Sequence, residues 1–219
     1  MRKIIVAPSL LSANKNDLVN ECKKAEDAKC EFIHFDVMDG VFVPNVSFSS
    51  SQLKEICDKH NCINDVHIMI ENPLEHVKEY IDNGADYLTF HLEACKDENY
   101  VIDTINFIKL SGCKVGISIK PKTQVEEVLK YLDKVDLVLI MSVEPGFGGQ
   151  KFISTALDKI HTCRNYIDSH NLKCLVEVDG GINNETGKLC KDAGADILVA
   201  GSYLYGHDDF NDRVKGLLN

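Results

Sequence analysis

Asn83-Gly84-Ala85-Asp86 leads directly into the apolar run Tyr87–His91, and a near copy, Ala193-Gly194-Ala195-Asp196, leads into Ile197–Gly201. In both stretches a glycine ends a helical pattern and a strand pattern starts at once, because glycine readily adopts the conformation that closes a helix. The copies lie 110 residues apart, half of the 219-residue chain. This spacing indicates that one helix-to-strand unit recurs from end to end.

Short apolar runs recur along the whole chain. Most are apolar on both faces, which is typical of parallel strands that are buried on both sides. The predicted strands are Lys3–Pro8, Glu31–Asp36, Ile63–Ile68, Asp86–His91, Cys113–Ser118, Asp136–Ser142, Cys174–Val178 and Asp196–Ala200.

Amphipathic stretches with helical spacing separate these runs, as in Asp17–Ala28, Glu75–Ile81 and Ile153–Tyr166. Eight strand-then-helix units without a linker predict an α/β protein, a single (β/α)8 TIM barrel over residues 1–219. A doubly wound open sheet is the alternative, but no G-x-G-x-x-G follows the first strand.

The composition narrows the class of protein. Apolar residues make up 44% and charged residues 26% of the chain, as in globular domains. Acidic residues outnumber basic ones 34 to 24, so neither nucleic acid nor an anionic membrane surface is an expected partner. No apolar run could span a bilayer, and Ile4–Ala7 is too short for a signal sequence. Nine cysteines without a C-x-x-C pair predict reduced core residues in a cytoplasmic protein.

Metal-ligating residue types gather where predicted strands end, the functional side of such a barrel. His34 and Asp36 share one strand face, His67 ends the next strand, and Asp179 follows the seventh. A single histidine there is more often an ordinary core residue. Two histidines beside two aspartates favour a divalent metal site. His91 is a candidate for contacting one of these ligands without binding the metal itself.

Asp36 and Asp179 come from opposite sides of the predicted ring. Two carboxylates facing each other across a pocket can remove a proton from one face of a carbon atom and return it to the other. A metal ion between them would polarise a carbonyl group and stabilise an enediolate. The pattern therefore predicts proton transfer next to a carbonyl group.

Methionines and glycines also occur where the predicted strands end, at the mouth of the barrel. Met38, Met69 and Met141 all fall at strand ends, where thioethers would shield an enediolate from water. Glycine-rich loops follow the last three strands, and their backbone N–H groups could hold a phosphate without side-chain charge. The residues of these loops are Gly146, Phe147, Gly148, Gly149, Gly180, Gly181, Gly201 and Ser202.

Several of these segments together resemble the ribulose-phosphate 3-epimerase family over essentially the whole chain. The two most specific are Asp36–Asn45 and Val143–Gln150. The others are Ser9–Ser12, Asp65–Met69, His91–Glu93 and Val178–Ile182.

The resemblance implies a homo-oligomer, a dimer or hexamer, that interconverts D-ribulose 5-phosphate and D-xylulose 5-phosphate in the pentose phosphate pathway. It implies one divalent metal ion per subunit, zinc first, with iron, manganese or cobalt as alternatives. The family's metal ligands fall on His34, Asp36, His67 and Asp179, and its acid/base pair on Asp36 and Asp179. Its substrate contacts fall on Ser9, His67 and the glycine-loop residues with Ser202, and its methionine collar on Met38, Met69 and Met141.

Departures from the family pattern are Asn14, Val41 and Ser49. The main alternative function is 3-epimerisation of a six-carbon ketose phosphate such as allulose 6-phosphate. A related barrel decarboxylase would need lysine where Met38 stands, and a Schiff-base aldolase would use Lys120. A binding protein without catalysis would lack one of the two aspartates.

Overall fold

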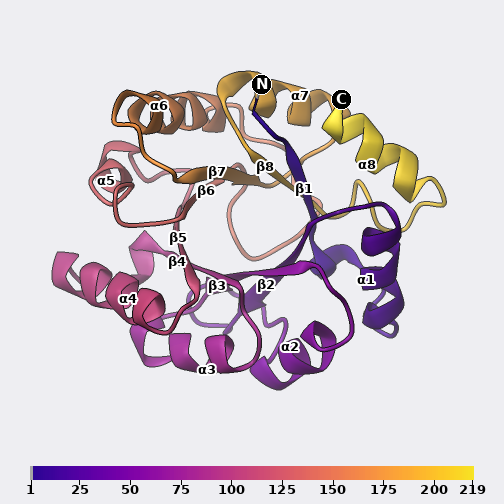
Figure 1. The fold of residues 1–219 in the computed structure, drawn as a ribbon, viewed down its shortest axis with the longest axis horizontal. Helices are drawn as coiled ribbons and strands as arrows, with labels where there is room; N and C mark the ends of the chain where they lie inside the picture. The colour runs from indigo at the N-terminus through magenta and orange to yellow at the C-terminus, as the bar shows by residue number, and fades with distance from the viewer. Residues whose placement is uncertain (1) are drawn as a thin grey trace.

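Eight parallel strands form the barrel in the computed structural model, which describes residues 2–219. The hydrogen-bonded order runs β1-β8-β7-β6-β5-β4-β3-β2, and a bridge between Ser9 and His34 joins β1 to β2. The helices lie in a ring outside the strands, with β1 between β8 and β2 (Figure 1). The predicted TIM barrel is confirmed, and the open-sheet alternative is wrong.

All eight predicted strands are present, and their ends differ from the predicted ones by at most two residues. They are β1 (Ile5–Pro8), β2 (Phe32–Met38), β3 (Ile63–Met69), β4 (Tyr87–His91), β5 (Lys114–Ile119), β6 (Leu137–Met141), β7 (Leu175–Asp179) and β8 (Ile197–Ala200).

The helices are α1 (Leu18–Asp27), α2 (Ser50–Cys57), α3 (Val77–Asp82), α4 (Glu98–Leu110), α5 (Glu126–Leu129), α6 (Ala156–Ser169), α7 (Asn184–Ala193) and α8 (Phe210–Leu218). Short 3-10 turns follow β1, β3 and β4 at Leu10–Ser12, Pro73–Glu75 and Leu92–Ala94. The predicted helix at Glu75–Ile81 is therefore wrong at its start. Its first residue belongs to the 3-10 turn that Pro73 opens, and the α-helix begins only at Val77.

The repeated Gly-Ala-Asp fragment has a structural role at the start of β4 and β8. The Asp86 carboxylate accepts the backbone N–H of Asn64 at 2.8 Å, and the Asp196 carboxylate accepts that of Val176 at 2.9 Å. Asp136 does the same for Val115 at the start of β6. Each of these aspartates thus ties its strand to the beginning of the preceding strand.

The barrel interior has an apolar and a polar part. Leu137, Leu139, Ile197 and Val199 from β6 and β8 belong to an apolar cluster. The polar part consists of fully buried side chains from the other strands, namely His34, Asp65, His67, Thr89, His91, Ser118 and Glu177. This many buried polar groups need partners inside the barrel, which points to a site there.

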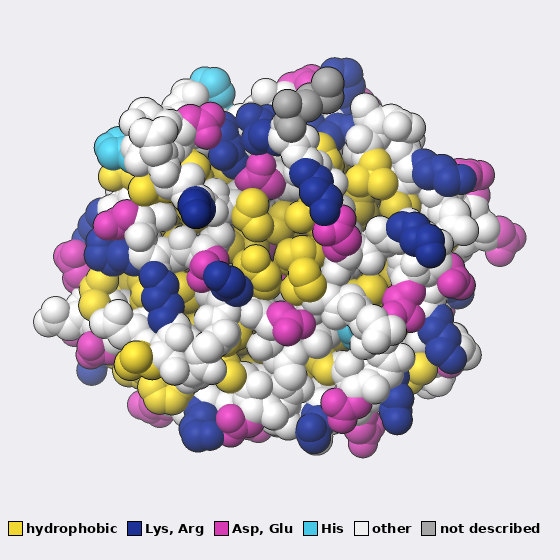
Figure 2. Space-filling view, in the orientation of Figure 1, with side chains coloured by type: hydrophobic (Ala, Val, Ile, Leu, Met, Phe, Trp, Pro, Cys, Tyr) yellow, Lys and Arg dark blue, Asp and Glu magenta, His cyan; other side chains and the backbone are white. Residues whose placement is uncertain are grey.

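Figure 2 shows hydrophobic side chains at the centre of one face, with Lys, Arg, Asp and Glu around them. Across residues 2–219, no helix is both long and apolar enough to cross a membrane. All nine cysteines are free; six are buried as predicted, and Cys57, Cys62 and Cys95 are half-buried.

Candidate metal centre and active site

A cavity opens at the carboxyl ends of the strands, where function was predicted. Strand-end side chains and the loops after β1, β6, β7 and β8 line it. Among the lining residues are Ser9, Asp36, Met38, Met69, Met141, Gly146, Phe147, Gly148, Gly149, Asp179, Gly180, Gly181, Gly201 and Ser202. His34 and His67 are fully buried and do not belong to this lining.

The four predicted metal ligands lie together, with Asp36 and Asp179 in the cavity lining and the two histidines buried next to them. One ligand atom from each of His34, Asp36, His67 and Asp179 lies within 4.8 Å of the others. Asp36 Oδ1 is 3.5 Å from His34 Nε2 and 3.4 Å from His67 Nδ1. Within the described residues neither ring nitrogen has a hydrogen-bond partner. Two buried, unpartnered imidazole nitrogens beside two carboxylates fit the donor set of a divalent transition metal.

The ring nitrogen of each histidine that does not face Asp36 contacts a second side chain. His34 Nδ1 lies 2.6 Å from Asp65 Oδ2. His67 Nε2 lies 2.8 Å from His91 Nε2, and His91 Nδ1 lies 3.2 Å from Glu93 Oε2. Such contacts orient metal-ligating histidines.

The two aspartates of the site have opposite pKa shifts. Burial raises the pKa of Asp36, but the adjacent imidazoles of His34 and His67 outweigh burial and lower it overall. Ser9 Oγ also donates a 2.6 Å hydrogen bond to Asp36 Oδ2, which favours the ionised form. Burial, and then the charge of Asp36, raise the pKa of Asp179. Such a pair can supply a general base, the ionised Asp36, and a general acid, the protonated Asp179.

The histidines differ in the same way. Burial lowers the pKa of His67 to about 4, so its ring is neutral, as a ligand must be. Burial also lowers the pKa of His34, but the carboxylates of Asp65 and Asp36 outweigh burial and raise it well above its ordinary value. These carboxylates favour positive charge at this spot, which a proton on His34 or a metal cation beside it would supply.

The three methionines line the same cavity as Asp36 and Asp179. Met38 and Met69 are register partners on β2 and β3, and Met141 is the register partner of Asp179. All three are buried and line the cavity. They place apolar thioethers, rather than proton donors, in the wall of the cavity.

The glycine loops bring backbone to the cavity wall. Gly181 has φ +63°, and a Cβ there would lie 2.6 Å from the backbone nitrogen of Phe152. A Cβ on Gly201 would lie 2.6 Å from Ser12 Oγ. The Ser142 hydroxyl donates to Gly180 O at 2.7 Å and joins the ends of β6 and β7. At Gly181 the close neighbour is backbone, so a side chain there would force the loop to move.

Sequence reasoning assigned no role to Asp65 or Glu177. Each lies two residues before a predicted ligand on the same strand, and this spacing alone places it on the interior face. Glu177 is fully buried, and neither of its oxygens has a partner in the part of the chain that the structure describes. Burial, and then the Asp65 carboxylate, raise the pKa of Glu177 well above its ordinary value.

Lys120 does not lie in the cavity. Its ammonium group lies 3.7 Å from the centre of the Phe42 ring in a cation–π contact, and neither residue belongs to the cavity lining. The structure therefore gives no support to a Schiff-base lysine. Of the departures from the family pattern, Ser49 caps α2 through Gln52 and Val41 is exposed. Nothing in the structure explains Asn14.

Comparisons with known proteins agree along nearly the whole chain. The model of the ribulose-phosphate 3-epimerase family matches residues 5–205. The ribulose-phosphate 3-epimerase of Bacillus subtilis (strain 168) is 44% identical over 213 residues, which cover 97% of this chain and 97% of the relative. That of Chlamydia pneumoniae is 40% identical over 217 residues, 98% of this chain and 93% of the relative.

Among solved structures, 3-hexulose-6-phosphate synthase from Salmonella typhimurium superimposes with a TM-score of 0.71 at 18% identity. The match covers 100% of this chain and 97% of that one. At this identity the likeness concerns the barrel alone.

Proposed function

The chain belongs to the ribulose-phosphate 3-epimerase family and is an epimerase of that kind, and we propose that Asp36 and Asp179 carry its proton transfers at carbon 3. It interconverts D-ribulose 5-phosphate and D-xylulose 5-phosphate. A six-carbon substrate is not favoured, because the curated relatives carry the ribulose-phosphate name. The observation that carries the proposal is the cluster of these aspartates with two unpartnered imidazole nitrogens, all within 4.8 Å.

The opposite pKa shifts give each aspartate a role. Asp36, ionised and held by the Ser9 hydroxyl, takes the proton from carbon 3 on its own side of the sugar. Asp179, whose pKa is raised, returns a proton from the other side. In the reverse direction the two carboxyl groups exchange roles. The methionines Met38, Met69 and Met141 keep water away from carbon 3 while neither face carries a proton.

We propose that His34, Asp36, His67 and Asp179 hold one divalent cation. When bound, the cation supplies Lewis-acid polarisation of the sugar carbonyl. Two imidazole nitrogens and two carboxylates favour zinc, with iron, manganese and cobalt as the other candidates. Asp65 and His91 orient the imidazole rings of the two histidines by contacting the ring nitrogens that do not face the metal site.

For the phosphate end of the substrate we propose the backbone of the glycine loops together with Ser202. These loops face the cavity from β6, β7 and β8, and a backbone site suits a chain of net charge −10. Ser9 lines the same cavity and is placed to touch the sugar. His67, which does not line it, is proposed to act on the substrate only through the metal.

The first test follows carbon 3 by NMR after incubation with ribulose 5-phosphate in deuterated water, with and without prior chelation. We expect xylulose 5-phosphate that carries one deuterium at carbon 3, and loss of this activity after chelation. The activity should return on addition of zinc. Full activity after exhaustive chelation would contradict the metal role, and no deuterium incorporation would contradict the proton-transfer mechanism.

A second test addresses the phosphate site through Gly181→Ala. The new Cβ must displace the backbone at Phe152, at a strain of about 1–3 kcal/mol. We expect KM to rise about tenfold, since about 1.4 kcal/mol of lost binding is a factor of ten, with a smaller change in kcat. Gly206→Ala is the matched control, because its φ is +81° but no atom lies within 4 Å of the added carbon. Equal KM values for the two variants would argue against this site.

We propose further that residues 1–219 act as one catalytic domain in a cytoplasmic homo-oligomer, a dimer or hexamer, that binds no nucleic acid. The net charge of −10 supports the last point.

A further inference from the structure

A relay of two side chains connects His67 to a loop outside the metal site. His67 Nε2 contacts His91 Nε2 at 2.8 Å, and His91 Nδ1 contacts Glu93 Oε2 at 3.2 Å. The other carboxylate oxygen, Glu93 Oε1, accepts the backbone N–H of Lys120 at 2.6 Å and the hydroxyl of Thr123. His34, by contrast, is held directly by the Asp65 carboxylate.

The hydrogen bonds of this relay can run in only one direction if His67 is a ligand. Its Nδ1 faces Asp36 Oδ1 at 3.4 Å and must keep a free lone pair for a metal. The proton of the neutral ring then sits on Nε2, which donates to His91 Nε2. The proton of His91 must in turn sit on Nδ1 and be donated to Glu93.

Glu93 therefore has to accept hydrogen bonds on both sides. The backbone N–H of Lys120 is a donor only, so the oxygen that faces it must accept. The oxygen that faces His91 must accept as well. Only an ionised carboxylate provides two acceptors. Burial raises the pKa of Glu93, but the hydrogen bonds from His91, Thr123 and Lys120 outweigh it and lower the pKa to about 2.

We propose that Glu93 is a positioning residue that fixes the tautomer of His67 through His91 and thereby sets the metal affinity of the site. The inference rests on the proposed metal function of His67. It places part of the control of that site in the loop after β5, more than 50 residues away along the chain from His67.

Glu93→Gln reverses the direction of the hydrogen bonds in the relay, and the glutamine side chain has almost the same shape as the glutamate. The amide oxygen of glutamine must stay on the side of the Lys120 N–H, so its NH2 group faces His91 Nδ1. His91 then accepts at Nδ1 and donates from Nε2, and His67 has to accept at Nε2. The proton of His67 moves to Nδ1, where it blocks the lone pair that a metal needs.

The experiment measures zinc affinity of the whole protein by competition with a chromophoric chelator, without using enzyme activity. We expect Glu93→Gln to bind zinc about 10–100-fold more weakly than the unsubstituted protein, the usual effect of a lost outer partner of a ligand. Glu93→Asp keeps a carboxylate acceptor and should retain more affinity than Glu93→Gln, although it is the less isosteric change. The absorption spectrum of the cobalt-loaded protein should change for Glu93→Gln only.

Glu127→Gln is the matched control. Glu127 is an exposed acid in the same groove as Glu93, and among the described residues its carboxylate accepts one hydrogen bond, from the backbone N–H of Gln124. Its substitution should leave the zinc affinity unchanged, which separates the relay from a general loss of negative charge.

Three outcomes would overturn the inference. An unchanged zinc affinity of Glu93→Gln would do so while leaving the proposed function intact. Equal weakening in Glu93→Gln and Glu93→Asp would show that side-chain fit, and not hydrogen-bond direction, matters. A protein that binds zinc no more tightly than a His34→Ala, His67→Ala double variant would contradict the metal function itself, and the inference with it.

Discussion

Asp36→Asn and Asp179→Asn are each expected to lose epimerisation by about 10²–10⁴-fold, the usual contribution of a positioned acid or base. An asparagine cannot take up the proton, yet its carbonyl oxygen can still ligate a cation. The carboxyl group that remains in each variant can still remove and return a proton on its own face of carbon 3. Each variant should therefore exchange deuterium into one epimer only, and the two variants should act on opposite epimers.

The measurement is NMR of both pentulose phosphates in deuterated water at saturating zinc, with the metal content of each variant determined alongside. Asp158→Asn is the control, because Asp158 is exposed on α6 and does not belong to the cavity lining. Exchange of the same epimer by both variants would contradict the assignment of one aspartate to each face.

Arg164→Met should lower the free energy of unfolding by about 3–5 kcal/mol, the usual cost of removing one partner of a buried ion pair. Arg164 on α6 pairs with Asp196 at the start of β8, and its Nε donates to Gly194 O at 3.1 Å. Methionine preserves the aliphatic stem that packs on Gly194 but leaves the largely buried Asp196 carboxylate without its guanidinium.

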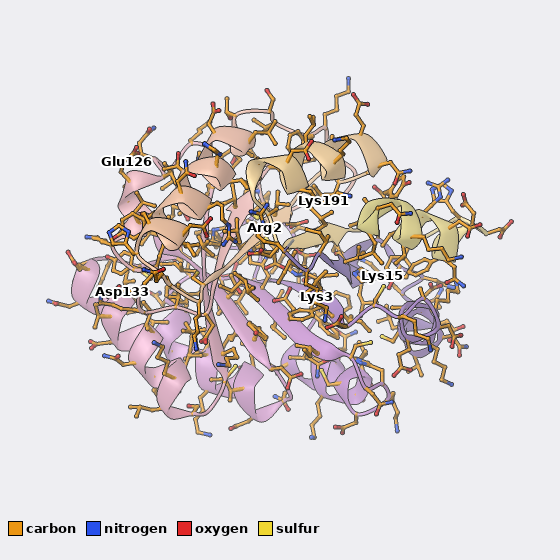
Figure 3. The ribbon with its side chains drawn as sticks, turned by 45° about the horizontal axis from the view of Figure 1, so that its top comes forward. Arg2, Lys3, Lys15, Glu126, Asp133 and Lys191 are labelled. Carbon is orange, nitrogen blue, oxygen red and sulfur yellow. The ribbon has the colours of Figure 1, made fainter. Side chains whose placement is uncertain are left out.

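Arg2 cannot replace Arg164 in this pair. Figure 3 shows Arg2 beside Lys191, whose carbonyl oxygen it contacts at 3.0 Å. Its Nε lies 3.7 Å from Asp196, and its side chain is much more exposed than that of Arg164. Solvent therefore screens its charge, and it offsets little of the loss.

Urea unfolding monitored by circular dichroism measures this change. Lys188→Met is the control, because Lys188 and Asp192 form an exposed pair one helical turn apart. The control should stay within about 0.5 kcal/mol of the unsubstituted protein. A similarly small effect of Arg164→Met would mean that water replaces the guanidinium at Asp196.

The sequence by itself determined the barrel and which strand-end side chains gather in it. Eight short apolar runs with helical stretches between them predict eight parallel strands. Each run is apolar throughout rather than alternating, which is typical of a parallel strand that is buried on both faces. Residues spaced by two on one strand share a face, so His34 and Asp36 could be placed together without a structure. Element ends were less certain, as Pro73 illustrates, because a local 3-10 turn depends on a single residue.

Only the tertiary structure decided which groups contact and position the residues of the predicted site. Asp65 behind His34, the His91–Glu93 relay behind His67, and the contact of Gly181 with Phe152 all join segments that are distant in sequence. Periodicity indicates the face of a strand that a side chain occupies. The atom it meets depends on the register between strands and on the path of loops such as Lys120–Thr123, which are set by the packing of the whole barrel.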